Sequence, residues 1–179
     1  MKKIAARGFT LVEMLIVIVI LGIVAKVAIP LLSSNDPQKL SVAAEETANL
    51  LRFALSEAKR TGGYVLVDGK STSGQLKLYN SDSIANLSSV INDPLTKRAA
   101  ILNVKDSAFS QGVTLTPKFM QGSVGYPQLL IGPGLSQLQV FDGIPNKGPL
   151  QANSGVLLAF GSQSVTVSIN HVTALVTLP

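Results

Sequence analysis

The sequence contains no cysteine, and it has one histidine, His171, among its 179 residues. The absence of cysteine excludes disulfides and thiolate metal sites, and a single histidine excludes a multi-histidine metal centre. His171 lies in a predicted turn, where we expect a solvent-exposed loop residue, and no nucleophile-elbow motif supports a catalytic triad. The sequence therefore predicts no catalytic residue, no cofactor and no resident metal, and we expect that the chain is not an enzyme.

Charged residues are also scarce: they make up 14% of the chain, against 46% hydrophobic residues. The formal net charge is +5, but Lys2, Lys3 and Arg7 supply three positive charges before residue 9. Residues 9–179 hold 12 Lys and Arg against 10 Asp and Glu. The excess of positive charge lies mainly in the first eight residues, so it is weak support for nucleic-acid binding.

An apolar run follows the basic N-terminus, and Leu15 to Ala25 carry no charge. As a helix, residues 9–30 extend about 33 Å, enough to cross a bilayer core of about 30 Å. The positive charges before residue 9 favour a cytoplasmic N-terminus and an extracytoplasmic C-terminal part. Lys26 lies near the far end, where its long side chain can reach the membrane interface. The pattern predicts a single membrane-spanning helix.

Three interpretations of this segment compete. A secretory signal peptide fits poorly, because residues 23–25 and 26–28 both lack a small residue at the upstream cleavage position. A plain membrane anchor explains the apolar run but leaves Glu13 unexplained. An acid inside an apolar helix costs about 2.5–3.5 kcal/mol on insertion scales, and such residues usually have a function. The third interpretation gives Glu13 a partner.

Residues 8–13, Gly-Phe-Thr-Leu-Val-Glu, resemble the class III leader junction of type IV prepilins and type II secretion pseudopilins. Gly22 and Pro30 also lie where many of those subunits carry them, and both are candidate helix-kink positions. The resemblance implies that prepilin peptidase cuts between Gly8 and Phe9 and N-methylates Phe9. It covers residues 1–30 closely.

The resemblance further implies that the apolar segment is kept, anchors the subunit in the bacterial inner membrane, and later forms the packed centre of a filament. Glu13 would then pair with the free terminal amine of a neighbouring subunit and act mainly as a register device. The expected function is that of a structural subunit, a pilin or pseudopilin. The expected partners are other such subunits, prepilin peptidase and inner-membrane lipid, in a type IV pilus or a periplasmic type II secretion pseudopilus.

The rest of the chain predicts an α+β protein in which a long helix packs against an antiparallel sheet. Pro30 should kink or interrupt the helix, Asp36 and Pro37 should restart it, and the glycine pair after residue 61 should end it. From Leu40 onward the apolar residues recur with helical spacing. The expected organisation is a cleaved leader at 1–8, a membrane and filament-core helix at 9–30, an amphipathic helix at 31–61 and a β-rich head at 62–179.

Short strand patterns fill the predicted head. We expect one antiparallel sheet of about five to seven strands. Residues 84–91 are ambiguous and read as a short helix, and residues 143–149 read as a turn or loop. The strand candidates are 64–67, 75–79, 99–104, 113–116, 128–131, 138–141, 156–160, 165–169 and 172–178.

A weaker resemblance links residues 51–60 and 165–177 to H-type minor pseudopilins and T-type minor pilins. It suggests an alternative function, a filament-tip module that captures DNA or a surface ligand. In the DNA-binding members the last turn carries closely spaced arginines, whereas residues 170–176 here contain no Arg or Lys. The adjacent basic pairs are Lys59-Arg60 and Lys97-Arg98. We therefore do not expect nucleic acid as a partner.

Two further motifs have plain interpretations. Residues 68–72, Asp-Gly-Lys-Ser-Thr, resemble the end of a phosphate-binding loop but lack its first glycine, so we expect a polar hairpin loop. Some pseudopilins hold calcium in a C-terminal loop, which leaves Asp142 as a candidate ligand, although the other aspartates lack calcium-loop spacing.

Overall fold

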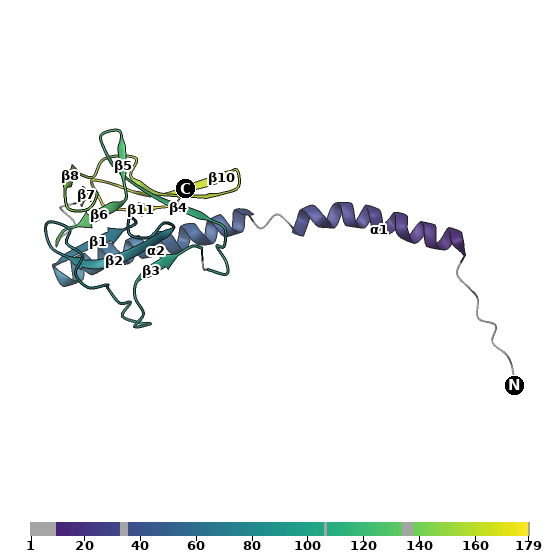
Figure 1. Ribbon diagram of the computed structural model, residues 1–179, viewed down its shortest axis with the longest axis horizontal. Coiled ribbons are helices and arrows are strands. Elements are labelled where there is room, and N and C mark those ends of the chain that lie inside the picture. Colours follow the sequence, from purple (N-terminus) through teal and green to yellow (C-terminus); the bar gives the residue numbers. More distant parts are fainter. Residues whose placement is uncertain (1–9, 33–35, 106, 134–137, 179) are drawn as a thin grey trace. The chain divides into compact units, whose positions relative to one another are not determined.

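The computed structural model describes residues 10–32, 36–105, 107–133 and 138–178, with only the backbone for residues 27–32 and Asp36 (Figure 1). It divides into two compact units, Met1–Asn35 and Asp36–Pro179. The fold is α+β, as predicted, with two helices followed by antiparallel β-sheet.

The first unit contains one helix, α1 (Leu11–Leu32), made almost entirely of Leu, Ile and Val. It runs without a break through Gly22 and Pro30 and ends two residues beyond the predicted boundary. Proline has no backbone N–H, so one helical hydrogen bond is missing at Pro30. Because the helix ends two residues later, this loss affects only its last turn. Residues 33–35, which separate α1 from the next helix, lie outside the described residues. Within the residues whose side chains are described, no helix has the length and apolarity that a membrane crossing needs.

The second unit begins with α2 (Asp36–Thr61), which is amphipathic as predicted. One face is buried and consists mainly of small side chains, so the helix approaches its neighbours closely. Gly62 ends the helix with a φ of +66°, and its N–H donates to the Ala58 carbonyl at 3.0 Å. This is the left-handed cap that glycine provides. The buried apolar residues of α2 are Leu40, Ala43, Ala44, Ala48, Leu51, Ala54, Leu55 and Ala58.

Eleven strands form two antiparallel sheets in the described residues. The six-stranded sheet has the order β3-β2-β1-β6-β7-β8, and the five-stranded sheet has the order β11-β10-β9-β4-β5. The strands are β1 (Tyr64–Asp68), β2 (Gln75–Ser81), β3 (Ile101–Asn103), β4 (Thr114–Gln121), β5 (Val124–Tyr126), β6 (Gln128–Ile131), β7 (Leu138–Phe141), β8 (Asn146–Pro149), β9 (Gly155–Phe160), β10 (Gln163–Ile169) and β11 (Val176–Thr177).

Helix α2 contacts strands of both sheets, and the three elements share one hydrophobic core (Figure 1). Along β1 the side chains alternate, so Val65 and Val67 enter this core while Leu66 points to the other face. There Leu66 joins a smaller cluster with Leu130 and Phe141. The six-stranded sheet is thus apolar on both faces near its centre, which explains the unbroken apolar run in β1.

Two hairpins use the same turn. Gly122-Ser123 joins β4 to β5, and Gly161-Ser162 joins β9 to β10. The glycine φ is +63° in the first turn and +59° in the second. A glycine with positive φ at the first central position matches the twist of paired strands.

The structure corrects the predicted head in several places. There are two sheets instead of one, because β4 pairs with β9, far along the chain, and no local pattern encodes that pairing. Residues 84–91 form no helix. The Asp82 carboxylate accepts hydrogen bonds from the N–H groups of Ile84 and Asn86, which gives the backbone an alternative to helical bonding.

The last predicted strand is also shorter than expected. Asn170 Oδ1 accepts hydrogen bonds from the N–H groups of Val172 and Thr173, both at 2.9 Å, so the turn continues to residue 175. Only Val176–Thr177 then pairs with β10. Strands β5 and β8 were not predicted. β8 contains Gly148 and Pro149, and it lies at a sheet edge, where proline is tolerated.

Gly155 is where the five-stranded sheet is most sensitive to an added side chain. A Cβ built there would lie 2.2 Å from the Val167 carbonyl oxygen of β10, and backbone cannot move away cheaply. We expect Gly155→Ala to lower the free energy of unfolding by about 1–3 kcal/mol, the usual cost of overpacking. Thermal unfolding of the detergent-solubilised chain measures this. Gly63→Ala, where a Cβ meets only the Thr61 hydroxyl at 3.4 Å, is the control and should change little. Equal effects of the two substitutions would contradict the prediction.

Candidate functional site

The predicted cleavage and methylation residues, Gly8 and Phe9, lie outside the described residues. The structure does describe the segment that follows them, including Glu13 and Gly22. Gly22 has open space around it, since a Cβ there would meet nothing within 4 Å.

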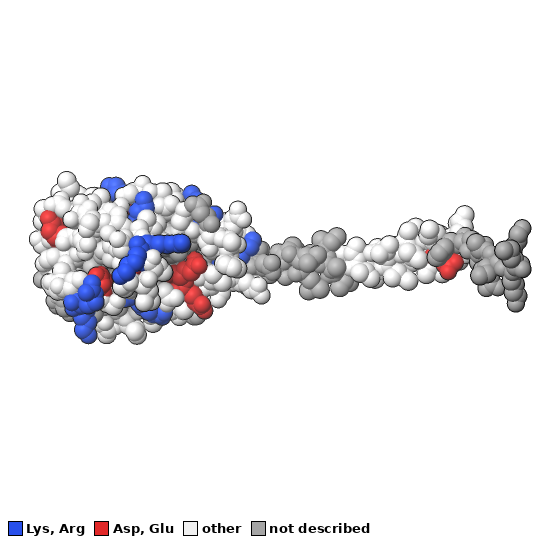
Figure 2. Space-filling view, turned by 90° about the horizontal axis from the view of Figure 1, so that it is seen from below, with Lys and Arg blue, Asp and Glu red and all other residues white. Residues whose placement is uncertain are grey.

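Every described side chain of α1, from Leu11 to Lys26, is exposed. Twelve of them are large and apolar, with exposed fractions from 42% at Val17 to 83% at Leu11. They surround the helix instead of forming one stripe, and the described part of the helix is almost free of charge (Figure 2). A helix that is apolar on all sides requires an apolar environment on all sides. These residues are Leu11, Val12, Met14, Leu15, Ile16, Val17, Ile18, Val19, Ile20, Leu21, Ile23 and Val24.

Thr10 caps the start of α1. Its hydroxyl oxygen accepts a hydrogen bond from the Glu13 N–H at 3.2 Å, and its carbonyl accepts one from the Met14 N–H at 3.2 Å. Thr10 and Glu13 have the Thr-x-x-Glu spacing of a capping box, and an acid in the first turn also favours the helix dipole. Our sequence analysis missed this role, although the spacing alone indicates it.

Glu13 and Lys26 are the charged residues of α1, and both side chains are exposed. Neither forms an ion pair within the described part of the chain.

The loop that resembles a phosphate-binding loop is closed by its own residues. Asp68 is buried, with 1% of its surface exposed. Its carboxylate accepts hydrogen bonds from the Lys70 N–H at 3.0 Å, from the Ser71 hydroxyl, and from Gln128 Nε2 at 2.8 Å. Gln128 in turn accepts a bond from the Gly143 N–H at 2.6 Å. The loop is a polar hairpin loop, as predicted, whose acid fastens β1 to β6.

Asp142, the candidate calcium ligand, is paired with a cation: its Oδ1 lies 2.7 Å from Lys70 Nζ. The hydrogen bond from Lys70 holds the pKa of Asp142 below its usual value. Among the described residues, no three His, Asp or Glu side chains gather as a metal site would require. In this structure the Asp142 carboxylate thus joins its loop to the loop that contains Lys70.

The two basic pairs are Lys59-Arg60 in α2 and Lys97-Arg98 before β3. In the described residues, Lys and Arg are interspersed with Asp and Glu on the face drawn in Figure 2. Arg60 donates two hydrogen bonds to the carboxylate of Glu57, at 2.6 and 2.9 Å. These bonds hold the pKa of Glu57 below its ordinary value. Glu57 thus neutralises the charge of Arg60 within the helix, which leaves Lys59 as the unpaired member of this basic pair among the described residues.

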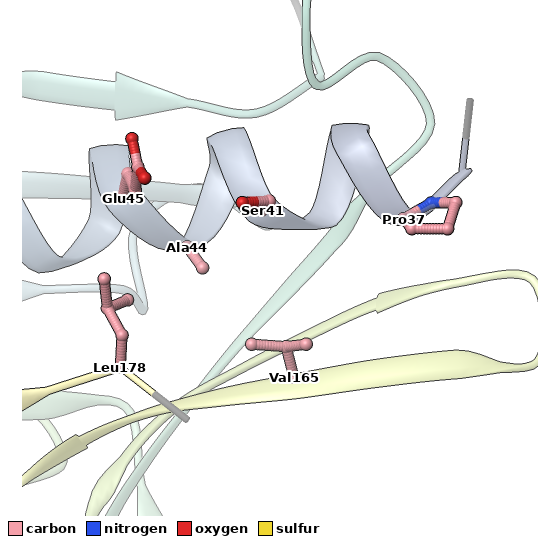
Figure 3. Close-up of a pocket in the computed structure, with 6 residues that line it drawn as sticks. All are labelled: Pro37, Ser41, Ala44, Glu45, Val165 and Leu178. Carbon is pink, nitrogen blue, oxygen red and sulfur yellow. The ribbon is translucent and has the colours of Figure 1, made fainter.

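A hollow of about 360 Å³ lies between α2 and the C-terminal strands (Figure 3). Ala44, Val165 and Leu178 point into the space between helix and strands. Its other lining residues are Pro37, Ser41 and Glu45, so it contains one titratable side chain. One carboxylate and one serine hydroxyl, with no histidine, lysine or second acid among the lining residues, do not make up a catalytic set.

Glu46, the next residue of α2, was not singled out by the sequence. One carboxylate oxygen, Oε2, is buried and has no hydrogen-bond partner among the described atoms. Burial raises the pKa of Glu46 above its ordinary value. Its charged form is disfavoured in the isolated chain, and no sequence pattern distinguishes it from the exposed Glu45 beside it.

His171 lies in the turn after β10 and is exposed, as predicted. It lines a hollow with residues 152–154 and with neighbours from β10, the same turn and β11, none of which is titratable. Serine and threonine hydroxyls line this hollow, but no acid does, so no carboxylate there orients the imidazole for proton transfer.

Residues 4–25 match the family model of the prokaryotic N-terminal methylation motif, the class III prepilin leader. The match covers the predicted cleavage junction and most of the exposed apolar part of α1. No solved structure matches the chain. The motif supports a type IV pilin-like or pseudopilin subunit, and this class of leader implies processing by prepilin peptidase and assembly with other pilin subunits.

The Thr10 cap generates a testable prediction. We expect Thr10→Ala to destabilise the first turn of α1 by about 1 kcal/mol, the usual cost of losing a cap. Amide hydrogen exchange at Glu13 in the detergent-solubilised chain should then become about fivefold faster. Thr10→Ser keeps the hydroxyl oxygen and should exchange like the natural chain. An unchanged rate in the alanine variant would show that the cap contributes nothing.

Proposed function

We propose that this chain, which carries the prokaryotic N-terminal methylation motif, is a structural subunit of a type IV pilus or type II secretion pseudopilus and assembles through α1. One observation carries the proposal: the motif coincides with a helix whose described apolar side chains are exposed on all sides. A signal that is removed with its apolar segment would not need the segment to be a regular, capped helix.

The exposed apolar surface of α1 provides the driving force for the helix to leave water, whether it enters lipid or packs against other helices. Burial of one Val, Leu or Ile side chain contributes about 1.5–3 kcal/mol when it is complete. Twelve such side chains, each partly exposed, therefore represent on the order of 10 kcal/mol of apolar burial. Before assembly, lipid of the inner membrane supplies this burial. In the filament, the helices of neighbouring subunits replace the lipid.

Exchange of lipid for helix gains little from hydrophobicity, because lipid tails are as apolar as leucine. Packing and polar contacts must then favour the assembled state. Glu13 is suited to this task. Cleavage before Phe9 creates an amine four residues upstream of Glu13, and the amine of one subunit pairs with Glu13 of its neighbour. A buried acid without that partner is strongly unfavourable, so the contact selects one register.

The head has a different role. Helix α2 buries its small side chains against both sheets, and the second unit thus has a core that does not depend on α1. The head presents no catalytic set, and its polar clusters serve hairpin loops. Its function in this proposal is to form the outer surface of the filament.

The mature N-terminus tests the proposed processing. We expect the exported chain to begin at Phe9, with a methyl group on its amine, because Gly8 and Phe9 occupy the junction of the methylation motif. Mass spectrometry of the chain purified from its native membrane measures this. A chain that retains residues 1–8, or one that lacks the whole apolar segment, would contradict the proposal.

The role of Glu13 is tested by Glu13→Ala. We expect normal or improved membrane insertion but a loss of about tenfold or more in filament incorporation, since breaking a buried ion pair costs about 3–5 kcal/mol. Quantitative immunoblotting of membrane and sheared-filament fractions measures both. Glu45→Ala removes an acid from the exposed side of α2 and should leave incorporation unchanged. Normal incorporation of Glu13→Ala would refute the pairing.

A further inference from the structure

Helix α1 carries two opposite charges, Glu13 and Lys26, and no other charged residue. Each is exposed and lacks an ion-pair partner in the described part of the chain. If α1 is the filament core, as the proposed function holds, both charges enter an apolar packing of helices. A charge in such surroundings requires a partner.

The two charges cannot satisfy one another within one helix. They are 13 residues apart, which corresponds to about 20 Å along the axis of an α-helix and about 140° around it. Their side chains therefore leave different faces at different heights. Each must find its partner on another molecule or at the membrane surface.

We infer that Lys26 of one copy pairs with Glu13 of a neighbouring copy displaced by about 20 Å along the helix axis. In this arrangement Glu13 of the second copy lies at the height of Lys26 of the first copy. Each copy therefore uses Lys26 toward one neighbour and Glu13 toward another. A contact between two different faces of identical subunits is heterologous, and its repetition gives an open helical array instead of a closed dimer.

Gly22 supports a close approach at this position. It lies four residues before Lys26, so it is on the same face of the helix, one turn below. A Cβ there would meet nothing within 4 Å, and the absence of a side chain leaves a depression beside the lysine. Small residues let membrane helices approach closely enough for polar contacts between them.

This contact is compatible with the amine pairing of the proposed function. Four residues of α-helix correspond to about 6 Å along the axis and 13 residues to about 20 Å, so the amine at residue 9 and Lys26 would reach Glu13 from neighbours at different displacements. A carboxylate has two oxygens and accepts several hydrogen bonds. Two cations then share one acid, and loss of Lys26 weakens assembly without abolishing it.

Thiol cross-linking between α1 helices tests the inference, because the natural chain contains no cysteine. Two tagged copies, one with Glu13→Cys and the other with Lys26→Cys, are produced together with an excess of the natural chain, which maintains the filament, and thiols in isolated filaments are joined by a short bifunctional maleimide. The yield of mixed dimer is expressed per Glu13→Cys copy in the filament, because loss of Glu13 lowers incorporation. The control replaces Lys26→Cys by Val24→Cys, which is nearly at the same height but about 160° around the helix. We expect the 13–26 pair to give at least about threefold more mixed dimer than the 13–24 pair, because only the first pair of thiols faces across the contact. Equal yields would overturn the inference.

A second measurement keeps the chain free of cysteine. We expect Lys26→Gln to lower filament incorporation by about threefold, and Lys26→Arg to restore it, since arginine keeps the charge. If Lys26→Gln incorporates normally while Glu13→Ala does not, the lysine contacts only lipid headgroups or water, and the inference fails.

The inference rests on the proposed function, and the same samples separate the two. Mass spectrometry of the N-terminus and the amount of chain in sheared filaments report on the proposed function. A chain that begins at methylated Phe9 and enters filaments, but shows no preference for the 13–26 pair, leaves the proposed function intact and refutes the lysine contact. A chain that is uncut and absent from filaments refutes both.

Discussion

The central constraint on this molecule is an apolar helix that its own chain does not cover. From Leu11 to Lys26 every described side chain of α1 is exposed, while the second unit completes its core without them. Covering that surface requires an apolar environment around the helix. The polar cap at Thr10 and the acid in the first turn stabilise the start of this helix. In the proposed filament, the same acid would align neighbouring helices.

The head, in contrast, is stabilised by close packing within its own chain. The buried face of α2 is rich in alanine, so two sheets approach one helix closely and share a single core. With no disulfide available, cohesion comes from this core and from a few buried polar contacts. Asp68 illustrates the second kind: its carboxylate collects three donors and fastens one hairpin loop to a neighbouring strand.

Local patterns predicted both helices and most strands, because those features depend on periodicity and on single residues such as Gly62. They did not predict that the strands divide into two sheets. That division depends on the pairing of β4 with β9, which are about forty residues apart. Local hydrogen bonds also overrode the apolar pattern: Asp82 prevented a helix and Asn170 shortened the last strand. The candidate site was found from Gly8 to Glu13 because its motif is contiguous, whereas the buried oxygen of Glu46 depends on tertiary packing.

The placement of α2 has a mechanical consequence. The second unit begins with this helix, and both sheets contact it along its length. Tension applied at Asp36 along the helix axis would load the contacts with both sheets together, as shear. To pull the helix out, its whole alanine face would have to slide past the sheets at once, instead of releasing one contact after another. Because resistance to force depends on the barrier to unfolding, such a head can withstand traction even with modest equilibrium stability.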